Sequence, residues 1–315
     1  MSIPSNIVSD PSFDRQALPP PPMSATRPLY WSVRRELWEN RSIVVAPLAA
    51  AAVVLFGFLI GTIHLPQRMR AILALDPARQ AARLALPYDF AAILIILTAF
   101  IVAVFYCLGA LHNERRDRSI LFWKSLPVSD LTAVLSKAGI PLVVLPLIVF
   151  AVIIAAQLVM LALETAILLG NGLSAAALWT EVPLFQMSLV LLYGLTVLSL
   201  WYAPIWGWLL LVSGWARRTT FLWAFLPPLA VCVVEKIAFD SSYFASMLSY
   251  RLGGFDDAFR FKAHGAAAHA EPSQVDLSQL DPIRFLSTPG LWVGLAFAAA
   301  FLAAAVWQRR RREPI

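Results

Sequence analysis

Six apolar segments constrain the fold of this chain more than any other feature, because each is about twenty residues long or longer. A helix of that length crosses a hydrocarbon layer about 30 Å thick. Backbone groups cannot remain unpaired in lipid, and these segments lack the alternation of barrel strands, so each is predicted to be a transmembrane helix. The predicted helices cover residues 43–63, 88–111, 138–169, 183–214, 221–239 and 289–307.

The composition agrees with an all-α polytopic membrane protein. Apolar residues make up 59% of the chain and charged residues 14%, against about 25% charged in a typical soluble protein. The third and fourth segments are too long for one straight crossing and too short for two. We therefore expect each to be one helix that extends beyond the bilayer or is kinked, with Pro141, Pro146 and Pro204 as candidate kink positions.

The distribution of lysine and arginine predicts how the chain is oriented. An even number of crossings places both termini on one side, and that side carries most of the Lys and Arg residues. By the positive-inside rule, both termini are predicted to be cytoplasmic, in a multi-pass protein of the inner cell membrane. The net charge of +6 is thus explained by topology, and no nucleic-acid partner is expected.

The regions around the apolar segments differ in character. Residues 1–28 are polar and include four consecutive prolines, which predicts a disordered cytoplasmic tail. Residues 29–42 predict an amphipathic helix at the membrane interface, with Trp31 and Trp38 on its aromatic face. The alternative is that the first transmembrane helix simply extends into the cytoplasm. The remaining predicted regions are a six-helix transmembrane domain (43–307), outer loops (65–87, 170–182 and the large 240–288) and a basic cytoplasmic tail (308–315).

The chain lacks the sequence motifs of catalysis and cofactor binding. Neither a G-x-x-x-x-G-K-[ST] phosphate loop nor an H-E-x-x-H, G-x-S-x-G or G-x-G-x-x-G motif occurs. We therefore expect no catalytic residue, no cofactor and no metal ion in this chain, and an intramembrane enzyme is the least favoured class.

Few ionisable residues lie inside the predicted helices. They are Glu164 late in the third helix and Glu235 and Lys236 late in the fifth. A charge in the bilayer centre costs about 2.5 to 3.5 kcal/mol on insertion scales, so such residues are candidates for function. Two interpretations stay open: an ion pair between helices, or a contact with a substrate or a proton.

The segment "LHNERRDRSILFWKSLPVSD" follows the second predicted helix and joins a charged run to an aromatic one. Glu114 and Arg118 stand four residues apart, which favours a short helix. Pro127 would end that helix, and Ser129 or Asp130 would cap the next. Its apolar residues exceed what a solvated loop needs, which indicates a docking surface. The candidate contact residues are Glu114, Arg115, Arg116, Asp117, Arg118, Ile120, Phe122 and Trp123.

Taken together, these features resemble the permease subunit of a type 2 ABC exporter (ABC-2 family). The resemblance covers six helices with both ends inside, an amphipathic N-terminal helix, a short charged loop after the second helix and a large outer loop before the last. Its local part is "NERRDRSILFWKSLPVSDLTAVLSK". The sequence departs from the family at residues 117–119, where Asp-Arg-Ser replaces the frequent Gly-Thr or Gly-Ser. The matching positions are Glu114, Leu126, Pro127, Val128, Ser129 and Lys137.

The resemblance implies that ATP is hydrolysed by another chain. In that family the loop carries a coupling helix that lies in a cleft of a separate ATPase subunit, and two permeases assemble with two ATPases. ATP and Mg would bind the ATPase partner, and the contact residues above would join it by salt bridges and apolar contacts. The scarcity of charges within the helices favours an apolar or amphipathic substrate.

A second class of function uses the same segment differently. The chain would be a membrane anchor or regulatory protein that recruits a cytoplasmic partner through this helix and transports nothing. Whether a partner permease is a second copy of this chain or a different chain is left open.

Overall fold

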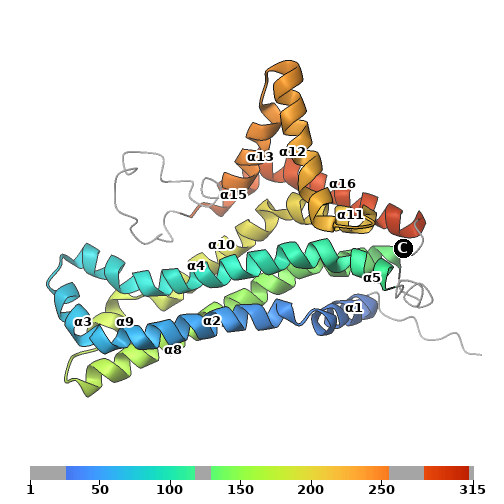
Figure 1. Ribbon diagram of the computed structural model, residues 1–315. Helices are drawn as coiled ribbons and strands as arrows, with labels where there is room; N and C mark the ends of the chain where they lie inside the picture. Colours follow the sequence, from blue (N-terminus) through green and yellow to red (C-terminus); the bar gives the residue numbers. More distant parts are fainter. Residues whose placement is uncertain (1–25, 118–128, 255–279, 312–315) are drawn as a thin grey trace, which may run out of the picture.

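The structure, a computed structural model, describes residues 26–117, 129–254 and 280–311. Within these ranges all regular structure is helical (Figure 1). The first half contains α1 (Thr26–Glu39), α2 (Ser42–Gly61), the 3-10 helix η1 (Thr62–His64), α3 (Leu65–Leu73), α4 (Pro77–Ala110), α5 (His112–Arg116), α7 (Asp130–Gly139) and the π-helix η2 (Ile140–Val144). The second half contains α8 (Leu145–Gly170), α9 (Ala176–Glu181), α10 (Leu184–Trp201), α11 (Ala203–Trp215), α12 (Thr220–Phe239), α13 (Tyr243–Gly253), α15 (Pro282–Ser287) and α16 (Pro289–Arg311).

Six helical spans of the described residues are long and apolar enough to cross a membrane. Each predicted segment overlaps one of them. The prediction of a multi-pass, all-α membrane protein is therefore confirmed for the helical content and for the number of candidate spans. The spans are Ser42–Leu73, Arg79–Arg116, Asp130–Gly170, Leu184–Trp201, Thr220–Phe239 and Pro289–Arg311.

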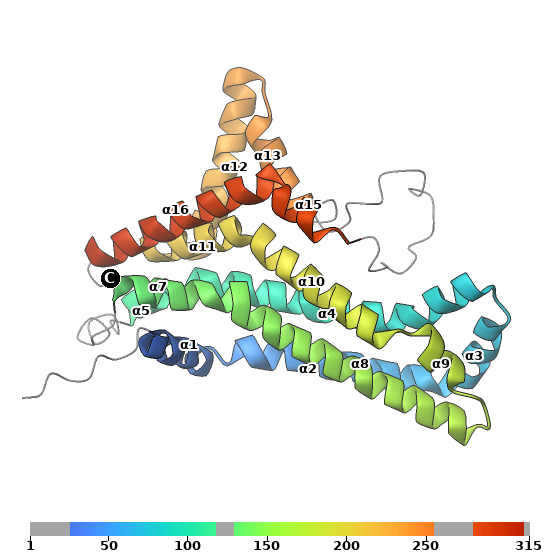
Figure 2. The same cartoon turned by 180° about the vertical axis from the view of Figure 1, so that it is seen from behind.

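The long helices form a body from which one helix pair projects. In both views α2, α4 and α8 run side by side, and α10 follows the same body before the chain turns into α11 (Figures 1 and 2). Helices α11 and α16 pack along each other, while α12 and α13 stand away from the rest. Ile95, Ile153, Trp201 and Leu210 are fully buried where these helices meet. The remaining apolar surface of the spans is left for lipid or for partner helices.

Proline interrupts regular α-helix in the third span. Helices α7 and α8 are joined without a break by the π-helix η2, and Pro141 lies in the first turn of that π-helix. Proline lacks a backbone N–H and its ring displaces the preceding turn, so the wider π turn accommodates it inside a continuous helix. This irregularity lies at one of the positions proposed from the sequence.

The fourth span is divided more sharply than a kink would divide it. Helix α10 ends at Trp201 and α11 begins at Ala203, with Tyr202 between them. Pro204 occupies the first turn of α11, where a missing N–H costs nothing. The predicted single helix over residues 183–214 is therefore two helices, and α11 is too short to cross a membrane alone.

Parts of the predicted outer loops are helical. The loop predicted over residues 65–87 contains α3 and the first turns of α4, which begins at Pro77 rather than at residue 88. A search for apolar runs misses these turns because they are amphipathic. The large loop contains α13 and α15, and residues 255–279 lie outside the described ranges.

Helix α1 is separate from the first membrane span. Residues 40–41 divide it from α2, and it packs on α7. Trp31 and Trp38 are exposed, as an interfacial helix requires, with the Arg34 guanidinium over both rings. The opposite side of α1 faces the protein and carries the buried Glu36.

Candidate functional site

The two ends of the predicted docking segment are structurally defined, although residues 118–128 lie outside the described ranges. Helix α5 follows α4 almost directly and ends at Arg116. On the far side, the Ser129 Oγ accepts a hydrogen bond from the Thr132 N–H at 3.1 Å, which caps α7. Ser129 is thus one of the two caps predicted from the sequence. The other, Asp130, binds an arginine on α16 instead.

Five helices meet beside this segment in a buried group of charged and polar side chains, which we call the charge cluster. Glu36 and Lys137 are 1% and 2% exposed, and Glu114 and Arg309 are 6% and 8% exposed. Charged residues are almost never buried to this extent unless they are paired. The members of the charge cluster are Arg35 and Glu36 of α1, Tyr106 of α4, Glu114 of α5, Asp130 and Lys137 of α7, and Arg309 of α16.

Lys137 lies between the two buried carboxylates. Its Nζ is 2.8 Å from Oε1 of Glu36 and 3.0 Å from Oε1 of Glu114. The Arg35 Nη2 contacts the same two oxygens, at 2.9 and 2.8 Å. Two cations therefore separate two carboxylates that would otherwise repel each other in a dry environment.

The second oxygen of each carboxylate is also bound. The Tyr106 hydroxyl donates to Oε2 of Glu36 at 2.9 Å, and Nη1 of Arg309 donates to Oε2 of Glu114. The Nε of Arg309 donates to Oδ1 of Asp130 at 3.1 Å. With both oxygens of Glu36 and of Glu114 paired, the buried carboxylates of the charge cluster meet the condition under which buried charges are tolerated.

The junction of α4 and α5 is held to the end of α11 by a further set of hydrogen bonds. The Ser213 Oγ accepts from the N–H groups of Leu111 and His112, at 2.8 and 3.1 Å. The Arg115 Nη1 donates to the carbonyl oxygen of Gly214 at 2.6 Å. The predicted docking segment (residues 111–130) therefore begins at the junction of α4 and α5, which is bound both to α11 and to the charge cluster.

The predicted contact residues divide into inward and outward groups. Glu114 and Arg115 are buried and bound within this chain, so the surface role expected of them is replaced by an internal one. Arg116 and Asp117 are exposed and pair with each other at 3.0 Å. Arg118, Ile120, Phe122 and Trp123 lie outside the described residues.

Glu164 lies at the other end of the bundle. It is buried on α8, and its Oε2 accepts a hydrogen bond from the Tyr88 hydroxyl of α4 at 2.8 Å. Its hydrogen-bond partner is therefore a neutral hydroxyl, and Arg68 of α3 attracts it electrostatically without forming a salt bridge among the described residues.

Glu235 and Lys236 have local partners at the end of α12. The Glu235 carboxylate accepts from the N–H groups of Tyr243 and Phe244, at 2.7 and 2.9 Å, and so caps α13. Lys236 pairs with Asp240 at 2.7 Å, one turn along the chain. Among the residues that the structure describes, the partners of Glu235 and Lys236 are therefore local, and neither residue forms an ion pair with another transmembrane helix.

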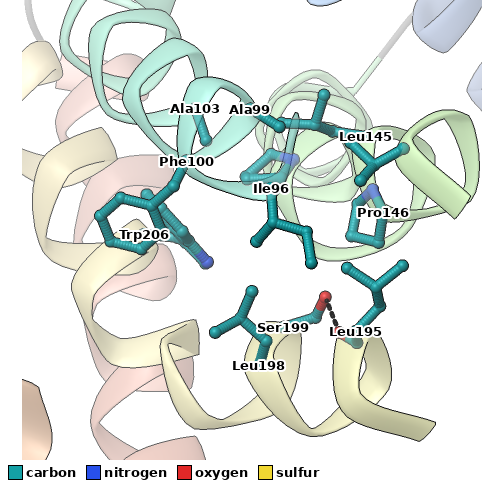
Figure 3. Close-up of a pocket in the computed structure, with 12 residues that line it drawn as sticks. Ile96, Ala99, Phe100, Ala103, Leu145, Pro146, Leu195, Leu198, Ser199 and Trp206 are labelled. Atoms are coloured by element: carbon teal, nitrogen blue, oxygen red, sulfur yellow. Dashed lines mark hydrogen bonds between the residues drawn. The ribbon is translucent and has the colours of Figure 1, made fainter. Parts of the chain in front are cut away.

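A small cavity lies between the two interrupted spans (Figure 3). It has a volume of about 40 Å³ and is almost entirely apolar. Pro141 and Leu145 line it from the π-helix and α8, while Leu198 of α10 and Trp206 of α11 line it from the other span. Unfilled space at this point leaves room for both spans to bend, because interiors packed without voids resist such movement.

The described residues contain no group of three or more His, Cys, Asp and Glu side chains that could hold a metal ion. The chemistry they offer at the charge cluster is ionic attachment between helices. Its members Glu36, Tyr106 and Arg309 were not identified from the sequence. Each has a partner on another helix, between 70 and 195 positions away in the sequence. The one sequence signal was the polar face of α1.

No protein-family model matches this chain, and neither a curated protein nor a solved structure matches it.

Proposed function

We propose that this chain is the membrane-spanning permease subunit of an ABC exporter of type 2. A separate cytoplasmic ATPase would bind ATP and Mg, and its hydrolysis cycle would drive export of an apolar or amphipathic substrate across the inner cell membrane. The charge cluster is the observation that carries the proposal, because it joins the base of the docking segment to four other helices. In the orientation that the distribution of Lys and Arg predicts, the charge cluster and both termini would be cytoplasmic.

A force applied to the docking segment would act first on α5 and on the start of α7. The charge cluster ties these two helices to α1, α4 and α16, so this end of the bundle moves as one body. The π-helix at Pro141 and the break at Tyr202 lie farther along the spans. Bending at these two points would convert a push at the cytoplasmic end into a change in spacing at the other.

The assembly would contain two permeases and two ATPases. The exposure of α12 is the argument for a second permease. This helix is the least buried of the six spans, with 6% of its most apolar stretch inside the protein. Apolar and aromatic side chains cover its exposed sides, including Trp223, Phe225 and Leu229. Oxidative cross-linking through Cys232 would test whether the second permease is the same chain or a related one.

Gentle detergent extraction of the tagged chain from its native membrane tests the proposal. We expect an ABC-type ATPase to co-purify, and its ATP hydrolysis to depend on the permease. Failure to recover any ATPase would overturn the exporter assignment. Recovery of a cytoplasmic partner without ATPase activity would instead favour a membrane anchor that recruits this partner and transports nothing.

The Arg116→Glu substitution tests the docking surface itself. Arg116 is exposed, so reversing its charge would weaken contact with the ATPase by about tenfold while the bundle stays folded. ATP hydrolysis and transport in reconstituted vesicles would then lose their coupling. Arg79→Glu is the matched control, since Arg79 is also exposed and paired with a nearby aspartate but lies at the opposite end. Equal behaviour of the two variants would exclude α5 from the docking surface.

A further inference from the structure

A cavity at the end of the bundle opposite the charge cluster has the size of a ligand site. It lies among α2, α3, α4 and α8 and has a volume of about 390 Å³, which is within the usual range of about 300 to 1,000 Å³ for ligand pockets. Figures 1 and 2 place α3 at the far end from α1 and α5. We call this space the α2–α4 cavity. Its lining is mainly apolar, from Val53, Phe58, Leu65, Phe90, Leu94 and Met160.

Two arginines line the same cavity. Arg68 is on α3 and Arg83 is in the first turns of α4, and both side chains are exposed. Among the described residues neither arginine takes part in a salt bridge. Both guanidinium groups are exposed beside an apolar space, and the charge of Arg68 also attracts Glu164. Together they can attract an anionic group, because guanidinium binds carboxylate and phosphate through paired hydrogen bonds.

The polar and apolar parts of the lining are separated along the helix axis. On α4 the lining extends from Arg83 to Leu94, a separation of about 16 Å at the rise of an α-helix. On the neighbouring helices it extends from Arg68 to Val53 in the same sense. Both arginines therefore lie toward the end of the bundle, beside apolar residues such as Met69 and Leu84, and the lining becomes mainly apolar toward the middle. A ligand that is charged at one end and apolar along its length matches this gradient.

The acid in the lining is already bound. Glu164 accepts a hydrogen bond from the buried Tyr88 hydroxyl at 2.8 Å. The arginines thus outnumber the acid, and they lie closer to the end of the bundle on α3 and α4. An anionic head group would contact the arginines, while Glu164, held by the Tyr88 hydroxyl, forms part of the wall farther in.

Two glycines keep the cavity open. Gly57 and Gly61 lie one turn apart on α2 and both line the space. A Cβ atom built on either glycine would meet no heavy atom within 4 Å. A side chain added at either position would therefore begin in open space and extend from a residue that lines the cavity.

We propose that the α2–α4 cavity binds an amphiphile from the membrane that carries an acyl chain and an anionic head group. The acyl chain lies between α2 and α4, and the carboxylate or phosphate of the head group binds Arg68 and Arg83. This site is independent of the exporter assignment, because binding needs neither ATP nor a partner chain. A failed binding experiment would therefore leave the proposed function untouched, and a missing ATPase would leave this site untouched.

Photo-labelling tests the site directly. The purified full chain in phosphatidylcholine nanodiscs is exposed to a palmitic acid analogue with a diazirine on its chain, and labelled peptides are identified by mass spectrometry. We expect labels concentrated on residues 53–69 and 83–94. Gly57→Leu fills the cavity and should reduce this labelling about tenfold, as should the double substitution Arg68→Gln with Arg83→Gln. Gly170→Leu is the control, since its Cβ also meets open space but lies outside the lining.

Competition identifies the head group. Unlabelled palmitic acid and lysophosphatidic acid should displace the probe, and whichever does so at lower concentration identifies carboxylate or phosphate as the favoured group. Palmityl alcohol, which has no charge, should not displace it. Equal labelling of all lipid-facing helices, labelling unchanged by Gly57→Leu, or displacement by the alcohol would each overturn the proposal. Circular dichroism and gel filtration of each variant check that labelling is compared between folded proteins.

Discussion

At the scale of single residues, Lys137 has the largest energetic consequence, because its ammonium group is shared by two buried carboxylates. Glu36 and Glu114 are almost fully enclosed, and water cannot replace a missing cation there. Complete pairing makes such a group tolerable, yet removing one partner leaves a charge buried without compensation. The charge cluster as a whole thus adds little net stability, but the loss of any one member would destabilise the fold strongly.

The Lys137→Met substitution tests this requirement. Methionine keeps much of the side-chain volume and removes the charge, so we expect a loss of about 3 to 5 kcal/mol in the free energy of unfolding. The thermal unfolding midpoint of the purified protein, followed by circular dichroism in detergent, would fall accordingly. Adding Glu36→Gln should recover part of the loss, because the carboxylate left without Lys137 is then neutral.

Lys236→Met is the matched control. Lys236 is 64% exposed and pairs with Asp240 on the adjoining turn, so its removal should leave the unfolding midpoint almost unchanged. If Lys137→Met behaved in the same way, the charge cluster would not be enclosed as described.

At the scale of elements, α11 and α16 form the most extensive contact between two of the described helices. Gly207 of α11 faces the backbone of Ala298, and a Cβ atom there would lie 3.2 Å from the Ala298 carbonyl oxygen and 3.3 Å from its Cα. This glycine lets a helix too short to cross the membrane alone pack along the last span. The contact continues toward the charge cluster, since α16 carries Arg309 and α11 ends beside α5.

Gly207→Leu is expected to force α11 and α16 apart. Overpacking of this kind costs about 1 to 3 kcal/mol or more, because the atoms in the way belong to backbone. The unfolding midpoint should fall, and hydrogen exchange of the α11 and α16 amides should become faster. Gly57→Leu makes the same chemical change into open space and should not lower the midpoint. Similar midpoints for the two variants would contradict this packing.

At the scale of the whole molecule, α12 is the least buried of the six candidate membrane spans in the described residues. It projects with α13 from the helical body (Figures 1 and 2). Cys232 lies on this helix and is partly exposed, whereas Cys107 is buried on α4. The proposed pairing of two permeases would place α12 of each near the other.

Oxidative cross-linking of the membrane-embedded protein tests this pairing. If the second permease is another copy of this chain, copper phenanthroline should produce a covalent dimer on a non-reducing gel. Cys232→Ser should abolish the dimer and Cys107→Ser should leave it unchanged. A dimer band that survives Cys232→Ser, or no dimer from the unsubstituted chain, would argue against two copies meeting at α12.

The sequence predicted the membrane spans well and the charge cluster poorly, for physical reasons. A span is a local property of about twenty consecutive apolar residues, so it can be identified without knowledge of any contact. The pairing of Lys137 with Glu36 joins residues 101 positions apart and depends on how α1 packs on α7. Glu114 was identified as a residue of interest, but its inward orientation depends on Lys137 and Arg309, which no local pattern places beside it. Pro204 predicted a kink close to the observed break at Tyr202, because proline disturbs the helical turn that precedes it.

The position of Arg309 has a consequence for the order of assembly. It lies on α16, and its partner Glu114 precedes it by 195 residues. During synthesis from the N-terminus, Glu114 and Asp130 must therefore stay hydrated until the last span has been inserted. The bundle can close at this end only after α16 has been synthesised, because a chain released before residue 309 would keep two carboxylates without this cation. Formation of α16 is thus the step that completes the charge cluster.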